Sequence, residues 1–316
     1  MKKPAYLGLL VRLAVSASLL GLFLWKMDLS KLSNVLLSTN IALWVIGVVL
    51  TLVGVAISSL RWQVLINTQG VNERYLKLTY VYTVGIFFNN LLPTSVGGDV
   101  FRAGYVGRSQ PHWAGIAFSI LVERAIGLVA LLGLGCLGVA YLLLSGDHQQ
   151  VLRMVGPYVV LVFILVTLAT IVLISPYPAS IMRVRIWLLE RPFLGRVFRG
   201  MPYLRTASQN VGIAIWSALS LSFLFQLVAI GTNYLGALAL GVNPPLVLFM
   251  VFVPLVALVT LAPVSLNGIG VREGISIGLW TQVGISTETA FAMGFLVYSF
   301  TLIVGALGGI AFVIRR

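Results

Sequence analysis

The chain has 316 residues, of which 59% are hydrophobic and only 9% are charged, and its mean hydropathy is +1.03. Because soluble domains carry about 25% charged residues, this composition excludes an ordinary soluble fold and indicates a protein embedded in a lipid bilayer. The 21 Lys and Arg residues outnumber the 8 Asp and Glu residues. They gather at the ends of apolar segments, which is typical of membrane topology signals rather than of nucleic-acid binding.

Six stretches are predicted to cross the membrane as helices, because each is apolar over about 20 residues, the length that spans a bilayer. In chain order they are Tyr6–Trp25, Ile41–Leu60, Ala125–Leu144, Val155–Ile174, Val211–Ile230 and Thr289–Ile314. The first contains Arg12 near one end, where a long side chain can reach the head groups. We expect this stretch to be an uncleaved first helix rather than a signal peptide.

Two further apolar stretches, Leu78–Gly98 and Pro245–Gly270, are interrupted by asparagine, proline and glycine. Proline removes a backbone donor and glycine loosens a helix. Such breaks persist at membrane depth only where the backbone lines protein or a wet cavity. We therefore expect both stretches to be re-entrant, so that a half-helix enters, turns and leaves on the same side.

The distribution of positive charge favours this topology. If the N-terminus is cytoplasmic and both broken stretches re-enter, 15 Lys and Arg residues fall inside and 4 outside, as the positive-inside tendency requires. Making only Leu78–Gly98 a full span would move the six arginines of the loop Ser175–Ser208 outside. We expect this basic cytoplasmic loop to lie on the anionic lipids of the inner leaflet, with both chain termini also cytoplasmic.

An internal repeat relates the two breaks at an offset of 170 residues. Pro93–Gly104 lies over Pro263–Gly274 with five of twelve positions identical, where composition alone would give roughly one. The alternative is a coincidence between two Gly/Pro-rich breaks, but the shared arginine and the agreement of the flanking spans argue against it.

The predicted fold is therefore an all-α polytopic membrane bundle forming one transmembrane domain, residues 1–316. Its pseudo-repeats cover about 1–150 and 151–316, and each holds three spans and one re-entrant element. An odd number of spans turns the second half upside down, which gives an inverted-topology repeat. Paired broken segments in such repeats point to a transport site.

Ionisable groups in the apolar part of the chain are functional candidates, because charge at membrane depth is costly. Asp99 lies near Arg102 in the first break, and Arg272 precedes Glu273 in the second. A third acid–base neighbour pair, Glu123-Arg124, occurs about where a helix enters the membrane. For each set the alternative is an interfacial ion pair that only anchors a helix.

The two breaks favour a polyanionic ligand such as a phosphate. The N-termini of half-helices present free amides, glycine turns let the backbone approach an anion, and arginine binds phosphate through its planar fork. Arg61-Trp62 is predicted most simply as a cytoplasmic anchor, with head-group contact as the alternative. The expected substrate-binding residues are Arg61, Asn89, Asn90, Ser95, Gly97, Gly98, Asp99, Arg102, Glu123, Arg124, Ser265, Asn267, Gly268, Gly270, Arg272 and Glu273.

No nucleophile–base pair, acid dyad or Walker motif stands out in the sequence. The two histidines, His112 and His148, lie far apart at segment edges, so we expect no metal site. We also expect no cofactor, no nucleic-acid partner and a transporter rather than an enzyme.

Four motifs in this order resemble a known family. They are Arg61-Trp62, Asn89 through Arg102, Glu123-Arg124 and Pro263 through Glu273. Together they resemble the flippase-like transmembrane family related to the membrane half of bacterial lysylphosphatidylglycerol synthase, over essentially the whole chain. The resemblance implies a prokaryotic plasma membrane and an anionic or aminoacylated phospholipid, or a related lipid-linked substrate. The bifunctional synthase has a soluble aminoacyl-transfer domain that this chain lacks, so we do not expect it to make lysylphosphatidylglycerol.

Three hypotheses follow. The first is a flippase-like translocase that moves an anionic, aminoacylated or polyprenyl-phosphate-linked lipid between leaflets. The second is a membrane-embedded lipid or glycolipid transferase with Asp99 or Glu123 as general base. The third is a membrane partner that holds a soluble synthase or glycosyltransferase through the loop Ser175–Ser208.

Overall fold

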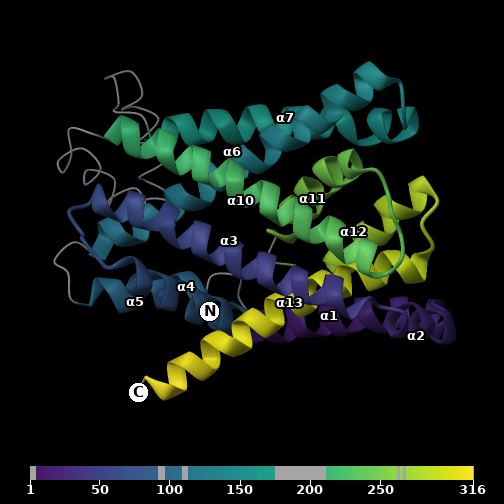
Figure 1. Cartoon of the computed structure of the whole chain (residues 1–316), viewed down its shortest axis with the longest axis horizontal. Coiled ribbons are helices and arrows are strands. Elements are labelled where there is room, and N and C mark those ends of the chain that lie inside the picture. Colours follow the sequence, from purple (N-terminus) through teal and green to yellow (C-terminus); the bar gives the residue numbers. More distant parts are fainter. Residues whose placement is uncertain are drawn as a thin grey trace.

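The computed structural model describes residues 5–91, 97–108, 113–174, 211–261, 264–265 and 268–315. Over these residues the chain consists of helices joined by short connections, without strands, which confirms the predicted all-α membrane bundle (Figure 1). The helices are α1 (Ala5–Lys26), α2 (Leu29–Leu37), α3 (Ile41–Asn67), α4 (Tyr75–Leu91), α5 (Gly97–Gly107), α6 (Trp113–Ser145), α7 (Gln149–Ile174), α10 (Val211–Ala239), α11 (Leu246–Thr260), α12 (Val271–Trp280), the 3₁₀ turn η3 (Thr281–Val283) and α13 (Thr287–Ile314).

Five of the described helices, α3, α6, α7, α10 and α13, are long and apolar enough to cross a membrane. The first predicted span, Tyr6–Trp25, lies within α1, and α1 together with α2 forms a sixth candidate span that bends by 95° between the two helices. At this bend the Asp28 carboxylate accepts hydrogen bonds from the backbone N–H groups of Ser30 and Lys31. This side-chain cap replaces the bonds that a continuous helix would supply, so α2 can begin in a new direction.

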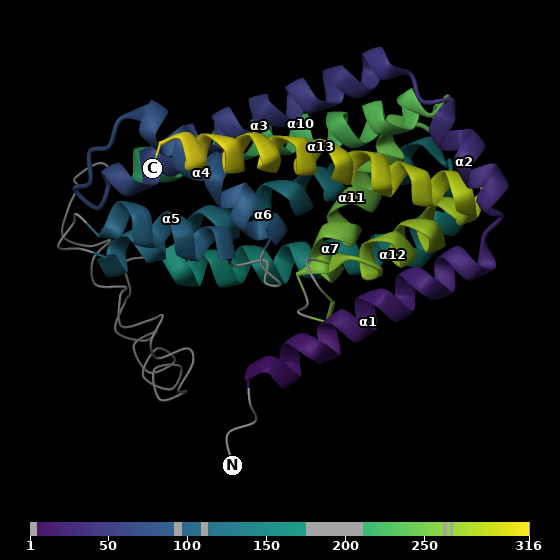
Figure 2. The ribbon, with the colours of Figure 1, turned by 90° about the horizontal axis from the view of Figure 1, so that it is seen from below.

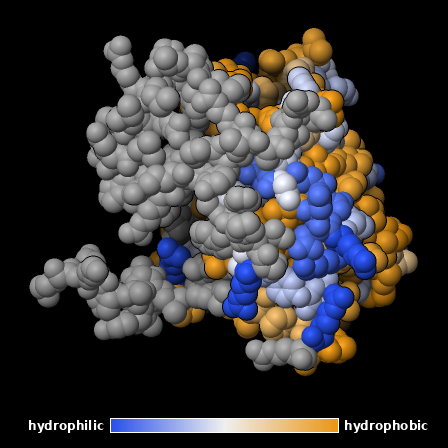
Figure 3. All heavy atoms as spheres, turned by 90° about the vertical axis from the view of Figure 1, so that its left-hand side faces the viewer, coloured by the Kyte–Doolittle hydropathy of each residue, from blue (hydrophilic) through white to orange (hydrophobic). Residues whose placement is uncertain are grey.

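The outer surface of the bundle is apolar. Helix α7 exposes Leu161, Leu165 and Leu168 along one face, at the spacing of a helical stripe. Figure 3 shows the end of the molecule that contains α5 and the C-terminus, where hydrophilic side chains gather while hydrophobic ones cover the flank. An apolar flank with a hydrophilic end is the surface expected of a protein that stands across a bilayer.

The first broken stretch folds back on itself as the antiparallel pair α4 and α5. A Cβ at Gly98 would collide with the Gly85 carbonyl group, so this close approach of the two backbones requires glycine at position 98. Further from the turn, the rings of Tyr80 and Tyr105 pack with their centroids 6.1 Å apart.

The second broken stretch forms the matching antiparallel pair α11 and α12. Gly268 packs against Thr260 near the turn. Phe249 and Phe252 contact Trp280 further away, with ring centroids 4.6 and 4.9 Å apart. The two hairpins lie toward opposite ends of the molecule, α4–α5 near the C-terminus and α11–α12 near α2 (Figures 1 and 2).

Helix packing follows the 170-residue offset found in the sequence. Adding 170 to the bounds of α3, α4, α5 and α6 gives 211–237, 245–261, 267–277 and 283–315, close to those of α10, α11, α12 and α13. The contacts also match: α4 packs on α13 as α11 packs on α6, and α5 packs on α6 as α12 packs on α13. These pairings are those expected of an inverted repeat, although that symmetry itself stays a prediction.

Two expectations about segment ends are wrong. Helix α3 continues to Asn67, so Arg61 and Trp62 lie buried within it and do not form a cytoplasmic anchor. Helix α6 begins at Trp113, so Glu123 and Arg124 lie well inside it rather than at its entry. Hydropathy ended the first of these segments too early and began the second too late, because these polar side chains find their partners inside the bundle, where they are stable within a span. The loop Ser175–Ser208 lies outside the described residues.

Candidate functional site

A cavity of about 120 Å³ lies between α3, the α4–α5 hairpin and α6. We call it the Arg102 cavity. Its wall contains five charged side chains, although these helices are otherwise apolar. The lining residues are Arg61, Tyr82, Gly85, Ile86, Asn89, Asp99, Arg102, Glu123 and Arg124.

Glu123 forms the centre of the charged cluster, and its side chain is almost completely buried. Its Oε1 accepts from Arg61 Nη2 at 2.8 Å, and its Oε2 accepts from Arg102 Nη2 at 2.5 Å. Tyr82 donates a further hydrogen bond to Oε1 at 3.1 Å. Both oxygens of this carboxylate are therefore occupied, and one acid on α6 fixes arginines from α3 and α5.

Asp99 extends the cluster toward the surface. Its Oδ1 lies 3.5 Å from Arg102 Nη1, and its Oδ2 lies 2.5 Å from Arg124 Nη2. The Arg124 side chain is 41% exposed, whereas those of Asp99 and Arg102 are 12% and 5% exposed. The chain of ion pairs thus runs from the interior at Arg61 to an accessible guanidinium at Arg124.

Arg102 is held by aromatic rings as well as by acids. Its guanidinium carbon lies 4.2 Å from the ring centre of Trp62 and 4.0 Å from that of Tyr82. Trp62 is itself fixed by a hydrogen bond of 3.2 Å from its indole nitrogen to the Ser119 hydroxyl. Such stacking orients a guanidinium while leaving in-plane donors for other partners. Within the described residues, the buried Nε atoms of Arg102 and Arg61 have no hydrogen-bond acceptor.

The N-terminus of α5 is closed by a side chain from α4. The Gly98 N–H donates to the Asn89 carbonyl oxygen at 2.7 Å. The space next to Gly98 is filled by Gly85, so this glycine serves close backbone packing in this conformation. One of the amides that the sequence suggested for phosphate is therefore already satisfied.

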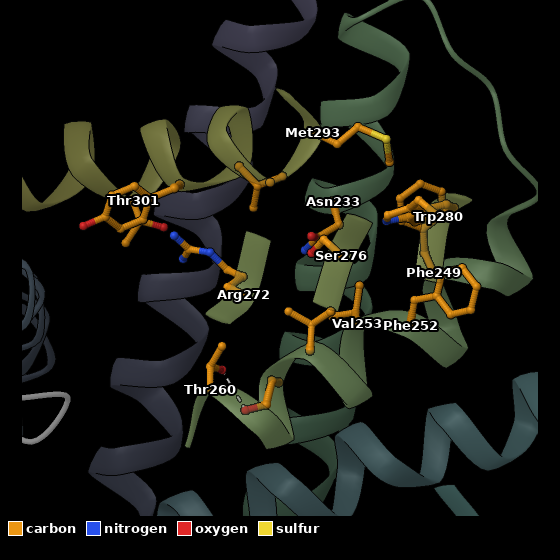
Figure 4. A pocket seen from close by; sticks show the side chains of 15 residues that line it. Asn233, Phe249, Phe252, Val253, Thr260, Arg272, Ser276, Trp280, Met293 and Thr301 are labelled. Atoms are coloured by element: carbon orange, nitrogen blue, oxygen red, sulfur yellow. Dashed lines mark hydrogen bonds between the residues drawn. The ribbon is translucent and has the colours of Figure 1, made fainter. Parts of the chain in front are cut away.

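A second cavity, of about 250 Å³, lies between α10, α11, α12 and α13, and we call it the Arg272 cavity (Figure 4). Arg272 lies at one end of the lining and Trp280 with Phe249 and Phe252 at the other, while Asn233 and Ser276 lie between them. It is thus a mainly apolar cavity with one charged end.

Glu273 neutralises Arg272 without lining the cavity. Its Oε1 accepts from Arg272 Nε at 3.1 Å and from Nη2 at 2.9 Å. Its Oε2 accepts from the Gly270 N–H at 2.7 Å, so the same carboxylate closes the N-terminus of α12. The Arg272 guanidinium lies over the Tyr298 ring, 4.5 Å from its centre.

The 170-residue offset shows how the two cavities differ. Arg102 corresponds to Arg272, and both line a cavity. Glu123 corresponds to Met293, Arg124 to Gly294 and Tyr82 to Phe252, three residues that line the Arg272 cavity. The second half therefore keeps the arginine and replaces the surrounding charged and polar groups by apolar ones.

Comparison with known proteins places the chain in a family. The family model described as the transmembrane region of lysylphosphatidylglycerol synthase matches residues 9–309. The chain belongs to this family. The family is one of membrane proteins, as the composition and the bundle indicate.

The relatives found are prokaryotic membrane proteins. UPF0104 membrane protein PH1989 of Pyrococcus horikoshii is 20% identical over 89% of each chain. A UPF0104 membrane protein of Methanothermobacter thermautotrophicus is 25% identical over 74% of this chain and 72% of the relative. UPF0104 membrane protein MJ1595 of Methanocaldococcus jannaschii is 28% identical, but the match spans only 37% of this chain and 36% of that protein. No solved structure matches the chain.

The predicted site residues separate into groups. The Arg102 cavity brings together Arg61, Asn89, Asp99, Arg102, Glu123 and Arg124. Of the described members of the second set, only Arg272 lines the other cavity, and Glu273 pairs with it from outside the lining.

The other predicted residues have packing roles or lie elsewhere. Asn90 donates to the Thr301 carbonyl group of α13. Gly270 packs against Leu19 of α1. Gly97 begins α5 and is buried, and Ser265 is buried with no partner for its hydroxyl among the described residues. Ser95 and Asn267 lie outside the described residues.

Sequence reasoning missed several residues of the two cavities. Tyr82 of the Arg102 cavity, and Tyr298, Asn233 and Trp280 of the Arg272 cavity, were not predicted. Ser222, which accepts from Arg61 Nη1 at 3.0 Å, was also missed. The available signal was polarity inside apolar spans, since Ser222 and Asn233 are uncharged polar residues within the largely apolar α10. Across the described residues no group of His, Cys, Asp or Glu has the arrangement of a metal site.

Proposed function

We propose that the chain is a flippase-like lipid translocase that moves the head group of an anionic, aminoacylated or polyprenyl-phosphate-linked lipid between leaflets. One observation supports it most: each of two helical hairpins, near opposite ends of the bundle, presents an arginine to a cavity. A translocase needs a polar place for the head group on the way from either leaflet. Broken helices that line cavities provide such places in transporters.

The Arg102 cavity has the chemistry to receive a phosphate. Among the described residues, the buried Nε of Arg102 has no hydrogen-bond acceptor, and the contact of Arg102 with Asp99 is long, at 3.5 Å. Arginine donors of this kind form strong charge-assisted hydrogen bonds with phosphate oxygens. The acyl chains would stay in the bilayer along the apolar flank of the bundle while the head group enters the Arg102 cavity.

The surroundings of the protein are part of the proposal. Membership of the family and the prokaryotic relatives support a prokaryotic plasma membrane as its location. We infer that both termini are cytoplasmic, because this topology places most Lys and Arg residues on the inner side of the membrane. We also infer that the basic loop Ser175–Ser208 contacts the anionic lipids of the inner leaflet, which attract its arginines. The same loop is the surface through which a soluble synthase or glycosyltransferase could bind.

The transferase alternative has less support, because its two candidate bases are already engaged. Both oxygens of Glu123 contact arginines, and both oxygens of Asp99 lie within 3.5 Å of Arg102 or Arg124. A general base must be able to accept a proton from substrate. Carboxylates held between guanidinium groups are poor at this task.

The test is a lipid-movement assay on the purified full-length protein in vesicles. Fluorescent lipids of the three proposed classes are reconstituted, and the fraction accessible to a membrane-impermeant quencher is followed with time. We expect at least one class to move faster than in protein-free vesicles, and Arg102→Ala or Arg272→Ala to abolish the gain. Arg153→Ala is the matched control, because Arg153 is exposed on α7 and lines neither the Arg102 cavity nor the Arg272 cavity. Failure to move any class would overturn the proposal.

A further inference from the structure

We propose that the lipid head group passes between the two cavities along three polar residues of α10, Ser222, Gln226 and Asn233, which we call the polar row. The inference rests on the proposed function, because it assumes that a head group moves between the Arg102 cavity and the Arg272 cavity. It assigns direct contact with the head group in transit to Gln226, which lines neither cavity.

The polar row occupies one face of α10. Its members are spaced by four and seven residues, the spacing that aligns side chains along one side of a helix. At 1.5 Å per residue the row spans about 16 Å. A polar row of this length runs through much of the apolar layer that a head group has to cross.

The two ends of the polar row reach the two cavities. At one end, the Ser222 hydroxyl accepts from Arg61 Nη1 at 3.0 Å, and Arg61 lines the Arg102 cavity. At the other end, Asn233 lines the Arg272 cavity (Figure 4). The Asn233 amide nitrogen donates to the Ala229 carbonyl group of its own helix at 2.9 Å. Helix α10 therefore joins the two sites through side chains that can form hydrogen bonds.

Gln226 lies between these ends and is buried. Its Nε2 donates to the Gly127 carbonyl group of α6 at 3.0 Å. A Cβ on Gly127 would meet Arg61 Nη1 at 3.3 Å and Gln226 Nε2 at 3.9 Å, so these two side chains lie beside each other. A glutamine amide can form up to four hydrogen bonds, and among the described residues Gln226 forms this one. Its remaining capacity is available to a passing head group.

Two more buried polar atoms adjoin this part of the polar row. Among the described residues, Ser58 Oγ and Arg61 Nε have no hydrogen-bond partner. Ser58 precedes Arg61 by three residues on α3, so both lie on the same side of that helix. Because buried polar groups without partners are costly, such atoms indicate contact with water or with a polar ligand. Ser58 and Gln226 lie outside the lining of the Arg102 cavity, so polar groups extend further into the bundle than the cavity does.

The repeat does not account for the polar row. The 170-residue offset places Leu52 and Ala56 of α3 where the first two members of the row stand, whereas Asn233 corresponds to the polar Gln63. Helix α3 thus packs in the bundle with apolar residues at two of the three positions. Packing alone does not call for serine and glutamine there, and contact with a polar cargo supplies a reason for them.

The first experiment measures whether water reaches the polar row. Gln226→Cys is made in the full-length protein with its single cysteine, Cys136, replaced by alanine. The protein in phosphatidylglycerol vesicles is treated with an anionic methanethiosulfonate reagent, which reacts with the thiolate and therefore requires a hydrated thiol. The control is Leu224→Cys, which lies at nearly the same depth on the outer side of α10, where Leu224 is 48% exposed. We expect Gln226→Cys to react at least about tenfold faster than Leu224→Cys.

The second experiment separates passage from binding, with phosphatidylglycerol as the probe. Gln226→Leu removes the amide at similar volume, and we expect the movement of fluorescent phosphatidylglycerol in vesicles to slow about tenfold or more. The affinity for phosphatidylglycerol, measured by native mass spectrometry, should stay within about twofold, because both cavity linings are intact. Gln226→Asn keeps an amide and should retain most of the rate. The control Ser220→Ala removes an exposed hydroxyl that bonds to the Trp216 carbonyl group of its own helix, and it should move lipid at the parent rate.

Each result bears on one of the two proposals. A Gln226→Cys thiol as unreactive as that of Leu224→Cys would overturn the inference, whatever the transport assay shows. Gln226→Leu moving lipid at the parent rate, or losing affinity as much as rate, would also overturn it and leave the translocase standing. A reactive Gln226→Cys in a protein that moves no lipid would refute the translocase and leave a hydrated polar row. Should Gln226→Leu fail to give a monodisperse peak in gel filtration, the reactivity of Gln226→Cys decides.

Discussion

Replacing Glu123 by glutamine is the most informative perturbation of this molecule. The glutamine keeps the size of the side chain but removes the charge that Arg61 and Arg102 share at 2.8 and 2.5 Å. Its amide nitrogen would face guanidinium donors in place of an acceptor. The buried guanidinium groups of Arg61 and Arg102 would then lose the carboxylate that they share, in a region from which water is nearly excluded.

The expected loss of stability is large. Removing one partner of a buried ion pair typically costs about 3–5 kcal/mol, because the remaining charge is left uncompensated. We expect Glu123→Gln to lose this much free energy of unfolding, measured by reversible unfolding of the purified protein in mixed micelles. Asp147→Asn, which neutralises an exposed carboxylate in the turn between α6 and α7, should change it by no more than about 0.5 kcal/mol.

A double variant tests whether the loss has this cause. Adding Arg61→Met to Glu123→Gln removes one of the two guanidinium groups that lost their carboxylate partner. We expect the double variant to be more stable than the sum of the two single losses predicts, by about 1 kcal/mol or more. A Glu123→Gln protein within about 1 kcal/mol of the parent, or strict additivity in the double variant, would refute the buried cluster.

Two further predictions concern packing and capping. Gly308→Ala places a methyl group against the Thr83 carbonyl oxygen of α4, so we expect the free energy of unfolding to fall by about 1–3 kcal/mol. The control is Gly278→Ala, whose methyl group meets open space, and we expect it to be neutral or stabilising. Asn89→Ala removes the acceptor of the Gly98 N–H. We expect the free energy of unfolding to fall by about 1 kcal/mol and backbone hydrogen exchange at the first turn of α5 to become faster. Unchanged hydrogen exchange there would contradict the cap.

The repeat offset shows what local sequence can predict. The bounds of α10 to α13 follow from those of α3 to α6 because each helix is fixed by its own apolar run and by the Gly/Pro breaks beside it. Both are local properties that the sequence displays directly. The turning back of the two broken stretches followed from the same local breaks together with the distribution of positive charge.

The charged site was only partly predictable. Asp99 and Arg102 stand out because ionisable groups are rare in this chain. Arg61 was misplaced as an anchor, because its partners Glu123 and Ser222 lie 62 and 161 residues away. The roles of Gly98 and Gly270 were also open, since either could face a ligand, and it is the neighbouring helices that fill the space beside them.

By itself the sequence determined that this is a helical membrane protein with two interrupted segments, because transfer into lipid and helix breaking depend on residues close together in the chain. Only the tertiary structure decided which arginine meets which acid, and that five charged side chains line one cavity while its counterpart is mainly apolar with a single arginine. The physical reason is that ion pairing and packing act over a few ångströms in space, between helices that the chain brings together from distant positions.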